Sequence, residues 1–148
     1  MKAWINNKEV EFEEGESILR AAKKAGIYIP TLCAFLPLDH TPGTCRMCLV
    51  EIEDPQAEGG MRIVTACTTP MEEGMRVHTR TKKVRRMQRL QAAWLFADHD
   101  QDCASCVRHG DCELQDIALY VGLKHNTCNG RFTTPRPFDP SQNGLLRD

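Results

Sequence analysis

Eight residues of this 148-residue chain fall into two consecutive sets whose types and spacing suit metal binding. The first set is four cysteines separated by eleven, two and eighteen residues, and the second is a histidine followed by three cysteines after gaps of three, two and five. Each set contains a C-x-x-C pair, in which one tight turn presents two sulfurs to one centre. Such ligands suit a [2Fe–2S] cluster, a [4Fe–4S] cluster or a zinc ion. The first set is Cys33, Cys45, Cys48 and Cys67, and the second is His99, Cys103, Cys106 and Cys112.

The first C-x-x-C pair lies in a loop rich in turn-forming residues. Gly43 precedes the pair, and a glycine there lets the backbone pass close to a buried inorganic core. Backbone N–H groups in such a loop can point at the negative sulfurs of a cluster. This chemistry favours an iron–sulfur cluster. The alternative is a zinc-stabilised structural or interaction module without redox function, although four-cysteine zinc sites more often contain two C-x-x-C pairs.

The composition limits the classes of protein to which the chain can belong. With 41% hydrophobic residues, 26% charged residues and a net charge of −1, it gives no reason to expect a nucleic-acid partner or direct membrane insertion. The N-terminus lacks the apolar run of a signal peptide, so we expect a cytoplasmic location. A disulfide framework is the alternative use of eight cysteines, but disulfide-rich scaffolds are usually short and secreted.

The elements around the first set predict a small α+β domain over residues 1–80. Polar and apolar residues alternate along residues 2–12 on either side of Asn6-Asn7, a pair that tolerates the positive φ of a hairpin turn. A helix is predicted to begin after its N-cap, Ser17. Strands are predicted at residues 49–53, 61–66 and 75–79, and an irregular loop at residues 33–48.

The second set lies in a region predicted to be a small helical domain, residues 81–127. Apolar residues recur at helical spacing over residues 81–98, with basic residues on the opposite side. We interpret the basic residues as a solvated face, with docking of an acidic partner as the alternative. A second helix is predicted from Cys112 to Gly122, and residues 128–148 predict an extended C-terminal strap. The apolar residues are Val84, Met87, Leu90, Trp94 and Leu95; the basic ones are Lys82, Lys83, Arg85, Arg86 and Arg89.

The loop of the first set resembles a known family. Residues 43–48, Gly-Thr-Cys-Arg-Met-Cys, are followed by Leu-Val-Glu-Ile-Glu at residues 49–53, with Cys33 ahead of them. This pattern resembles the N-terminal [2Fe–2S] domain shared by the large iron–sulfur subunit of respiratory complex I, many [FeFe]-hydrogenases and NAD-linked formate dehydrogenases. The resemblance implies a ferredoxin-like β-grasp fold. It also implies that the [2Fe–2S] ligands are Cys33, Cys45, Cys48 and Cys67.

The second set resembles the motif that follows this domain in the same families. The spacing from His99 through three cysteines, and the Glu-Leu-Gln at residues 113–115, are similar to the one-histidine, three-cysteine [4Fe–4S] motif. A neutral imidazole in place of a thiolate leaves a cluster less negative and should ease its reduction. The [4Fe–4S] ligands implied by the resemblance are His99, Cys103, Cys106 and Cys112.

Together the two sets predict an electron-transfer protein, an oxidoreductase component that relays single electrons between clusters. We find no nucleophile–base pair, phosphate loop or open metal site, so we assign no catalytic residue to this chain. The resemblance implies partners within a redox complex: a further ferredoxin-like domain, a catalytic subunit and a flavin- or NAD-binding subunit. Residues 136–148 resemble the segment that leads into that further domain, which favours a fragment over a complete short subunit. Cys128 belongs to neither set and is interpreted as a free thiol.

Overall fold

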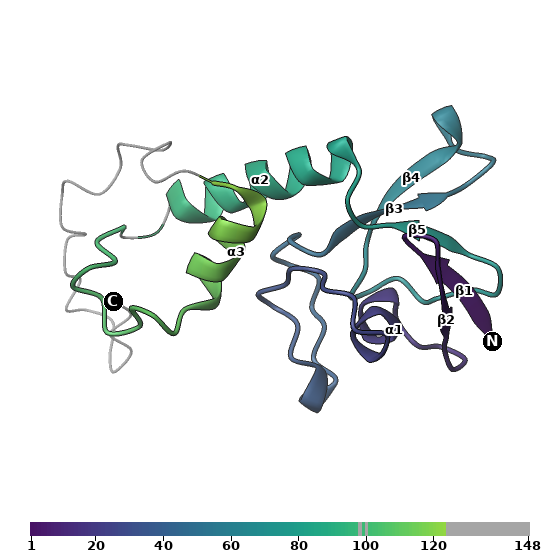
Figure 1. Cartoon of the computed structure of the whole chain (residues 1–148), viewed down its shortest axis with the longest axis horizontal. Helices are drawn as coiled ribbons and strands as arrows, with labels where there is room; N and C mark the ends of the chain where they lie inside the picture. Colours follow the sequence, from purple (N-terminus) through teal and green to yellow (C-terminus); the bar gives the residue numbers. More distant parts are fainter. Residues whose placement is uncertain (98, 100, 124–148) are drawn as a thin grey trace, which may run out of the picture.

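The computed structural model of the chain describes residues 1–97, 99 and 101–123. Its helices and strands are β1 (Lys2–Ile5), β2 (Lys8–Glu11), α1 (Ile18–Lys24), β3 (Leu49–Glu53), β4 (Met61–Thr65), β5 (Arg76–His78), α2 (Lys82–Ala97) and α3 (Glu113–Val121), with short 3₁₀ turns η1 (Leu36–Leu38) and η2 (Glu58–Gly60). The strands and α1 form one part of the molecule, and α2 leads from it to α3 (Figure 1). The irregular loop predicted at residues 33–48 is confirmed, with η1 inside it.

The N-terminal hairpin forms as predicted. β1 and β2 pair antiparallel with Ala3 opposite Val10, and the turn between them holds Asn6 at φ 50° and Asn7 at φ 67°. Two consecutive positive φ values define a type I′ turn, whose twist matches that of the strands it joins. Because alternate residues of a strand share a face, Ala3 and Ile5 both enter the core.

The strands form one mixed sheet in the order β2-β1-β5-β3-β4. β1 runs parallel to β5, and the other neighbouring pairs are antiparallel. The strands predicted at residues 49–53, 61–66 and 75–79 correspond to β3, β4 and β5 to within one residue at each end. The predicted α+β fold is confirmed, and a hairpin, a helix and further strands in this order give the ferredoxin-like β-grasp arrangement.

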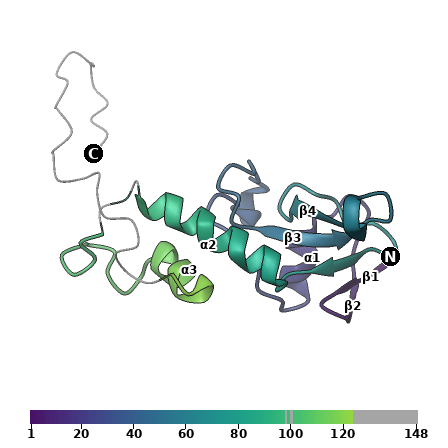
Figure 2. The same cartoon turned by 90° about the horizontal axis from the view of Figure 1, so that it is seen from above.

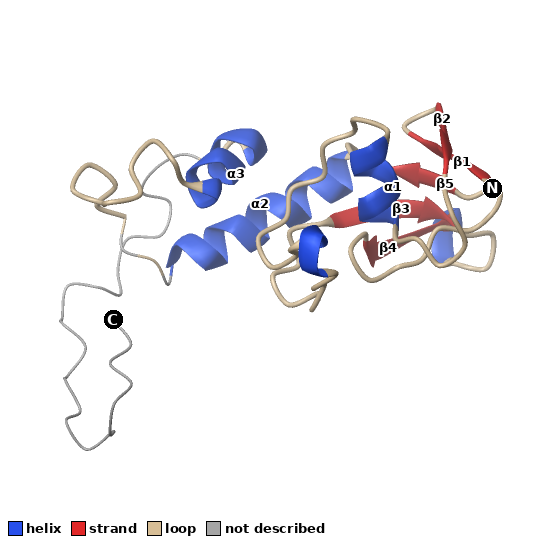
Figure 3. Cartoon of the chain, turned by 90° about the horizontal axis from the view of Figure 1, so that it is seen from below, coloured by secondary structure: helices blue, strands red, loops and turns tan. Residues whose placement is uncertain are grey.

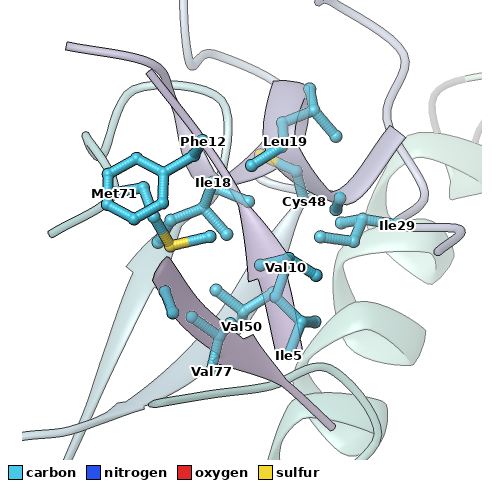
Figure 4. Close-up of a cluster of buried hydrophobic side chains, with 14 of the residues drawn as sticks. Ile5, Val10, Phe12, Ile18, Leu19, Ile29, Cys48, Val50, Met71 and Val77 are labelled. Carbon is cyan, nitrogen blue, oxygen red and sulfur yellow. The ribbon is translucent and has the colours of Figure 1, made fainter. Parts of the chain in front are cut away.

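The main hydrophobic core lies between the sheet and α1 (Figure 4). α1 begins where predicted, because the hydroxyl of its N-cap Ser17 accepts a hydrogen bond of 3.3 Å from the backbone N–H of Arg20. Ile18 of the helix and Val50 of β3 are fully buried in this core. The apolar surface removed from water here fixes the helix against the strands. The first ligand set is therefore attached to a packed scaffold.

α2 forms where a helix was predicted, but the predicted apolar stripe is partly wrong. Met87, Leu90 and Trp94 are 37%, 48% and 67% exposed. The buried positions instead follow an i, i+4 series, and one of them is the polar Gln88, whose side-chain amide donates a 3.0 Å hydrogen bond to the carbonyl of Leu49. That bond satisfies a polar group that would otherwise be costly to bury. The buried residues of α2 are Val84, Gln88, Ala92 and Phe96.

α3 packs beside α2, as Figure 2 shows from above. It ends at Gly122, which caps the helix in the left-handed conformation at φ 67°, so the predicted end is confirmed. A long irregular connection joins α2 to α3 (Figure 3). Cys128 and the strap predicted at residues 128–148 lie outside the described residues. Within the described part of the chain, no helix is both long enough and apolar enough to cross a bilayer.

Candidate metal centres

Cys48 and Cys67 are brought together by the β3–β4 pairing. In that register Leu49 lies opposite Thr65, and the N–H of Ala66 donates a 2.9 Å hydrogen bond to the carbonyl of Cys48. Cys48 directly precedes β3, and Cys67 follows the end of β4 by two residues. Antiparallel pairing therefore places both at the same end of the ladder, where they are only 1% and 2% exposed.

The start of α1 holds the turn that carries Cys67. The N–H groups of Ile18 and Leu19 donate hydrogen bonds of 3.0 Å and 2.8 Å to the carbonyls of Thr69 and Ala66. The first N–H groups of a helix have no partner within the helix, so they are available for this contact. The position of Cys67 is thus fixed by the helix as well as by the sheet.

The loop from Cys33 to Cys48 brings the other two cysteines to the same place. The backbone N–H of Cys45 donates to the Cys33 sulfur at 3.5 Å. The next glycine upstream, Gly43, has φ 67°, and a Cβ added there would lie 2.9 Å from the Thr68 methyl group. Gly43 therefore permits the close approach of the two ligand-bearing loops, while the expected close approach to an inorganic core stays a prediction.

The electrostatics of the first set show how close its sulfurs lie. Burial opposes ionisation of Cys33, but hydrogen bonds from Cys45 and Thr44 outweigh it and hold the pKa of that thiol below its ordinary value. Burial, together with the nearby Cys67 and Cys45 sulfurs, raises the pKa of the Cys48 thiol to about 12. Thiolates this close repel one another unless a cationic centre lies among them, and a bound metal is such a centre. The first set fits a metal–sulfur group.

The four members of the second set line one pocket between the end of α2 and the start of α3. His99, Cys103, Cys106 and Cys112 share this pocket with Phe96, Arg108, Leu114 and Gln115. The predicted second set is therefore brought together in the structure. Its soft sulfur and imidazole donors suit iron held in a cluster.

The position of His99 is set by the end of α2. Its backbone N–H donates to the carbonyl of Phe96 at 3.2 Å, and the side-chain amide of Gln101 donates to the same carbonyl at 3.0 Å. The rings of Phe96 and His99 meet edge to face with centroids 6.3 Å apart. Phe96, buried by α2 packing, thus orients the imidazole of the second set.

Cys103 and Cys106 of the second set are held by turns, and Cys112 is the N-cap residue of α3. The N–H of Cys103 donates to Gln101 O at 2.8 Å and that of His109 to Cys106 O at 3.0 Å, while the N–H of Arg108 approaches the Cys106 sulfur at 3.4 Å. The seven cysteines in the described part of the chain are all free thiols.

No group of three or more His, Cys, Asp or Glu side chains within the described ranges has the arrangement that a single metal ion requires. A [2Fe–2S] cluster divides its four thiolates between two irons, so it needs a wider arrangement of the same ligands.

Met47 helps to join the two regions, a role that the sequence did not reveal. It lies between Cys45 and Cys48 in the sequence, and its fully buried side chain packs with Ala92 of α2 and with Ile117 and Val121 of α3. Cys45 is packed against the same cluster. The available signal was an apolar residue inside the C-x-x-C pair, although nothing local indicated its partners.

Two protein families match consecutive parts of the chain. The family described as 2Fe-2S iron-sulfur cluster binding domain matches residues 2–82. The family described as NADH-ubiquinone oxidoreductase-G iron-sulfur binding region, a 4Fe-4S family, matches residues 88–127. The first match contains the whole first ligand set, and the second contains the whole second set.

Curated proteins and a solved structure resemble the same region. The NADP-reducing hydrogenase subunit HndD of Solidesulfovibrio fructosivorans is 35% identical over 130 residues, covering 85% of this chain and 21% of that protein. A subunit of the NADH-quinone oxidoreductase of Rhizobium meliloti (strain 1021) is 38% identical over 122 residues, covering 82% of this chain and 14% of that protein. A crystal structure of NAD⁺-reducing [NiFe]-hydrogenase in the H₂-reduced state aligns with a TM-score of 0.74 and 32% identity, covering 83% of this chain and 49% of that chain. The chain thus spans about a fifth or less of the length of these two curated relatives.

Proposed function

Because the chain belongs to the 2Fe-2S iron-sulfur cluster binding domain family, we propose that it relays single electrons between a [2Fe–2S] and a [4Fe–4S] cluster within a larger oxidoreductase. The observation that supports the proposal is the packed cluster around Met47, which includes Cys45 of the first predicted set and residues of α2 and α3, the helices whose ends border the pocket lined by the second predicted set. A relay requires centres held at a fixed separation, and a continuous core between their supports provides that.

The ligands of each cluster follow from the two sets. The [2Fe–2S] cluster of the first family is assigned to Cys33, Cys45, Cys48 and Cys67, and the [4Fe–4S] cluster of the second to His99, Cys103, Cys106 and Cys112. Support comes from the hydrogen bond from Cys45 to the Cys33 sulfur, and from the pocket that the second set lines. When bound, each cluster takes up and releases one electron.

The chain itself tunes and protects these centres. Cys48 and Cys67 are buried, so they keep water from the first centre, while N–H groups directed at sulfur stabilise negative charge. His99 contributes a neutral ligand to the second centre, which favours the reduced state relative to an all-thiolate site. The two centres therefore have different potentials, as a directional relay requires.

The whole assembly is a hydrogenase or an NADH-linked oxidoreductase, the classes named for the similar proteins. Its further ferredoxin-like domain, its catalytic subunit and a flavin- or NAD-binding subunit supply the substrate chemistry. A formate dehydrogenase remains a prediction from the sequence, as do the domain limits at residues 80 and 127. A cytoplasmic location is proposed because thiols in C-x-x-C pairs are kept reduced there.

The test is the iron and acid-labile sulfide content of anaerobically purified protein, with electron paramagnetic resonance before and after dithionite. We expect about six irons and about six sulfides per chain, and two distinct signals after reduction. Zinc without sulfide would overturn the relay in favour of the structural module. About two irons with a single signal would remove the second centre from the proposal.

A further inference from the structure

One face of α2 is exposed although it carries large apolar side chains. Met87, Leu90 and Trp94 are 37%, 48% and 67% exposed, and their spacing of three and four residues aligns them in one stripe. The opposite face packs against β3 and α3. In Figures 1 and 2, no described element lies over the outer side of α2.

The first half of the same helix carries unbalanced positive charge. α2 contains five basic residues and no acidic one. Two of the five are engaged within the fold, because Lys83 lies 3.7 Å from the Glu51 carboxylate and the Arg89 guanidinium donates to Val121 O at 3.0 Å. Lys82, Arg85 and Arg86, the other three, make no ion pair with any residue that the structure describes.

These three charges oppose the stability of the helix that carries them. The N-terminal end of a helix is the positive end of its dipole, so cations in the first turns are unfavourable. Lys82 lies three and four residues before Arg85 and Arg86, and like charges at these spacings repel. Attraction to an external negative surface would offset both unfavourable effects.

The stripe and the charges together have the composition of a protein interface. Trp, Met and Arg are enriched at such interfaces, where an apolar centre is surrounded by a polar rim. Exposed apolar patches rimmed by charge mark interaction sites. A nucleic acid or an anionic membrane also attracts cations, but the net charge of −1 on the whole chain works against binding a polyanion. The composition favours a protein partner.

The C-terminal end of α2 adjoins the second ligand set. α2 ends at Ala97, and the ring of Phe96, on the buried side of its last turn, contacts the ring of His99. Trp94 lies on the exposed side of that last turn. A protein bound along the stripe would therefore extend to the end of the helix that borders the second centre.

We propose that the outward face of α2, defined as Lys82, Arg86, Met87, Leu90 and Trp94, is the docking surface for an acidic redox protein or domain. The occupant presents carboxylates to the basic half of the helix and an apolar side chain to the stripe. Transfer of electrons across this contact rests on the proposed relay function, whereas the binding itself does not.

The test uses chain with verified iron and sulfide content and, as the probe, a small [2Fe–2S] ferredoxin of net negative charge. The dissociation constant is measured by titration calorimetry at low and at physiological salt, and carbodiimide cross-links are located by mass spectrometry. We expect cross-links at Lys82 and Lys83 in preference to Lys2, Lys8 and Lys23. Affinity should fall about tenfold or more with added salt, because exposed charges are screened.

A matched pair of double variants isolates the charges. Lys82→Gln/Arg86→Gln should weaken binding about tenfold or more, while Lys8→Gln/Lys23→Gln, with the same change in net charge at other exposed positions, should stay within about twofold. Equal losses in the two variants would mean attraction to net charge alone and would overturn the docking surface. A ferredoxin that does not bind, or stronger binding to phosphatidylglycerol vesicles than to ferredoxin, would overturn it as well.

A second pair isolates the apolar stripe. Trp94→Ser should weaken binding about tenfold with the salt dependence unchanged, because a buried tryptophan is a typical interface hot spot. Leu119→Ser is the control, since Leu119 of α3 is 83% exposed and lies outside the stripe. Iron content is measured in each variant, so that a failure of docking with both clusters present is distinguished from a failure of the relay. Equal effects of the two substitutions would contradict the proposal.

Discussion

Two ligands of the first set are buried by the fold, whereas none of the second set is. Cys48 and Cys67 are 1% and 2% exposed at the end of a strand pair, and the start of α1 is bonded to the turn around Cys67. Cys33 and Cys45 are half-buried in a loop, as are the three cysteines of the second set. His99 is exposed, in a connection whose described residues form turns but no helix or strand. We therefore expect the fold to position Cys48 and Cys67 before any metal binds, whereas the second site depends on the centre that it holds.

Removing the metal should produce the largest difference in hydrogen exchange between the two regions. After oxidation and chelation, backbone amides of β3 and β4 should keep their protection from hydrogen exchange, because the sheet and its core remain. Amides of residues 101–112 should lose nearly all of theirs, since few hydrogen bonds and no buried side chain hold that connection. Hydrogen exchange followed by mass spectrometry measures both in one sample. Equal loss of protection in the two regions would refute the comparison.

Met47 should couple the stability of the first region to the stability of α3. Met47→Ala removes a fully buried side chain from the cluster shared by the first-site loop, α2 and α3, and should cost about 2–5 kcal/mol. The exchange of Ile117 and Val121 amides should increase as well, because α3 loses one of its buried contacts with the first region. Urea unfolding and hydrogen exchange of the holoprotein provide the two measurements.

Met71 supplies the control for this substitution. It is 3% exposed and lies in the main core, away from the joint. Met71→Ala should therefore reduce overall stability while leaving α3 exchange unchanged, and Met47→Leu should restore most of what Met47→Ala loses. If Met47→Ala and Met71→Ala affect α3 alike, the joint does not couple the regions.

Each ligand loop contains a glycine in the left-handed region, and the two should differ in their tolerance of alanine. Gly43→Ala meets the Thr68 methyl at 2.9 Å as well as the backbone strain of φ 67°, and should cost about 2–4 kcal/mol. Gly110 has φ 81°, but a Cβ there has nothing within 4 Å. Gly110→Ala should cost only about 1–2 kcal/mol, the strain alone. Shifts in the urea midpoint at equal iron content measure the difference.

The contact with Thr68 can be tested separately from the strain. The Thr68 hydroxyl lies 2.6 Å from that of Thr65, so the side chain is not free to rotate away from an added methyl group. Thr68→Ser keeps this hydroxyl and removes the methyl, so it should recover part of the loss in Gly43→Ala. No recovery would mean that backbone strain explains the whole loss of stability in Gly43→Ala, and that residues 43 and 68 are not in close contact.

The sequence predicted elements whose signal is local. The Asn6-Asn7 turn, the Ser17 cap and the strands around residues 49–53 and 61–66 depend on periodicity and on residues next to one another in the chain. The candidate ligands were found for the same reason, since their spacing is a property of the sequence. What the sequence could not supply were the contacts between distant segments.

The buried face of α2 could not be predicted from local sequence alone. Hydrophobicity alone placed Val84, Met87 and Trp94 in one stripe, but of these three only Val84 is buried. The buried series runs instead from Val84 through Gln88, whose amide donates to the Leu49 carbonyl, a contact between residues 39 positions apart. The role of Met47 was missed for a similar reason, because its partners lie on two later helices.

Acid should lower the stability of the first region by protonating a carboxylate that is not a metal ligand. The expected loss of stability is the smallest of those predicted. Burial opposes ionisation of Glu16, but the Lys24 ammonium 2.9 Å away and the Glu13 N–H 3.0 Å away outweigh it and hold the pKa of this carboxyl below its usual value. A folded-state pKa below the unfolded value means that the ion pair stabilises the fold above about pH 4.3, and that this contribution is lost as the pH falls through the folded pKa. Because Lys24 is half exposed, the contribution at neutral pH should be below about 1 kcal/mol.

Glu16→Gln tests this contribution in the metal-free chain, where the clusters cannot contribute to acid sensitivity. The variant should be slightly less stable than the natural chain at pH 7, and the difference should vanish once the pH falls below the folded pKa of Glu16, because both side chains are then neutral. Glu14→Gln, at an exposed neighbouring carboxylate, should match the natural chain across the whole range. Urea unfolding followed by circular dichroism gives the difference at each pH. A gap between Glu16→Gln and the natural chain that persists to the lowest pH, with no decrease as the pH falls, would mean that packing of the side chain, and not its charge, stabilises the start of α1 and with it the turn that carries Cys67.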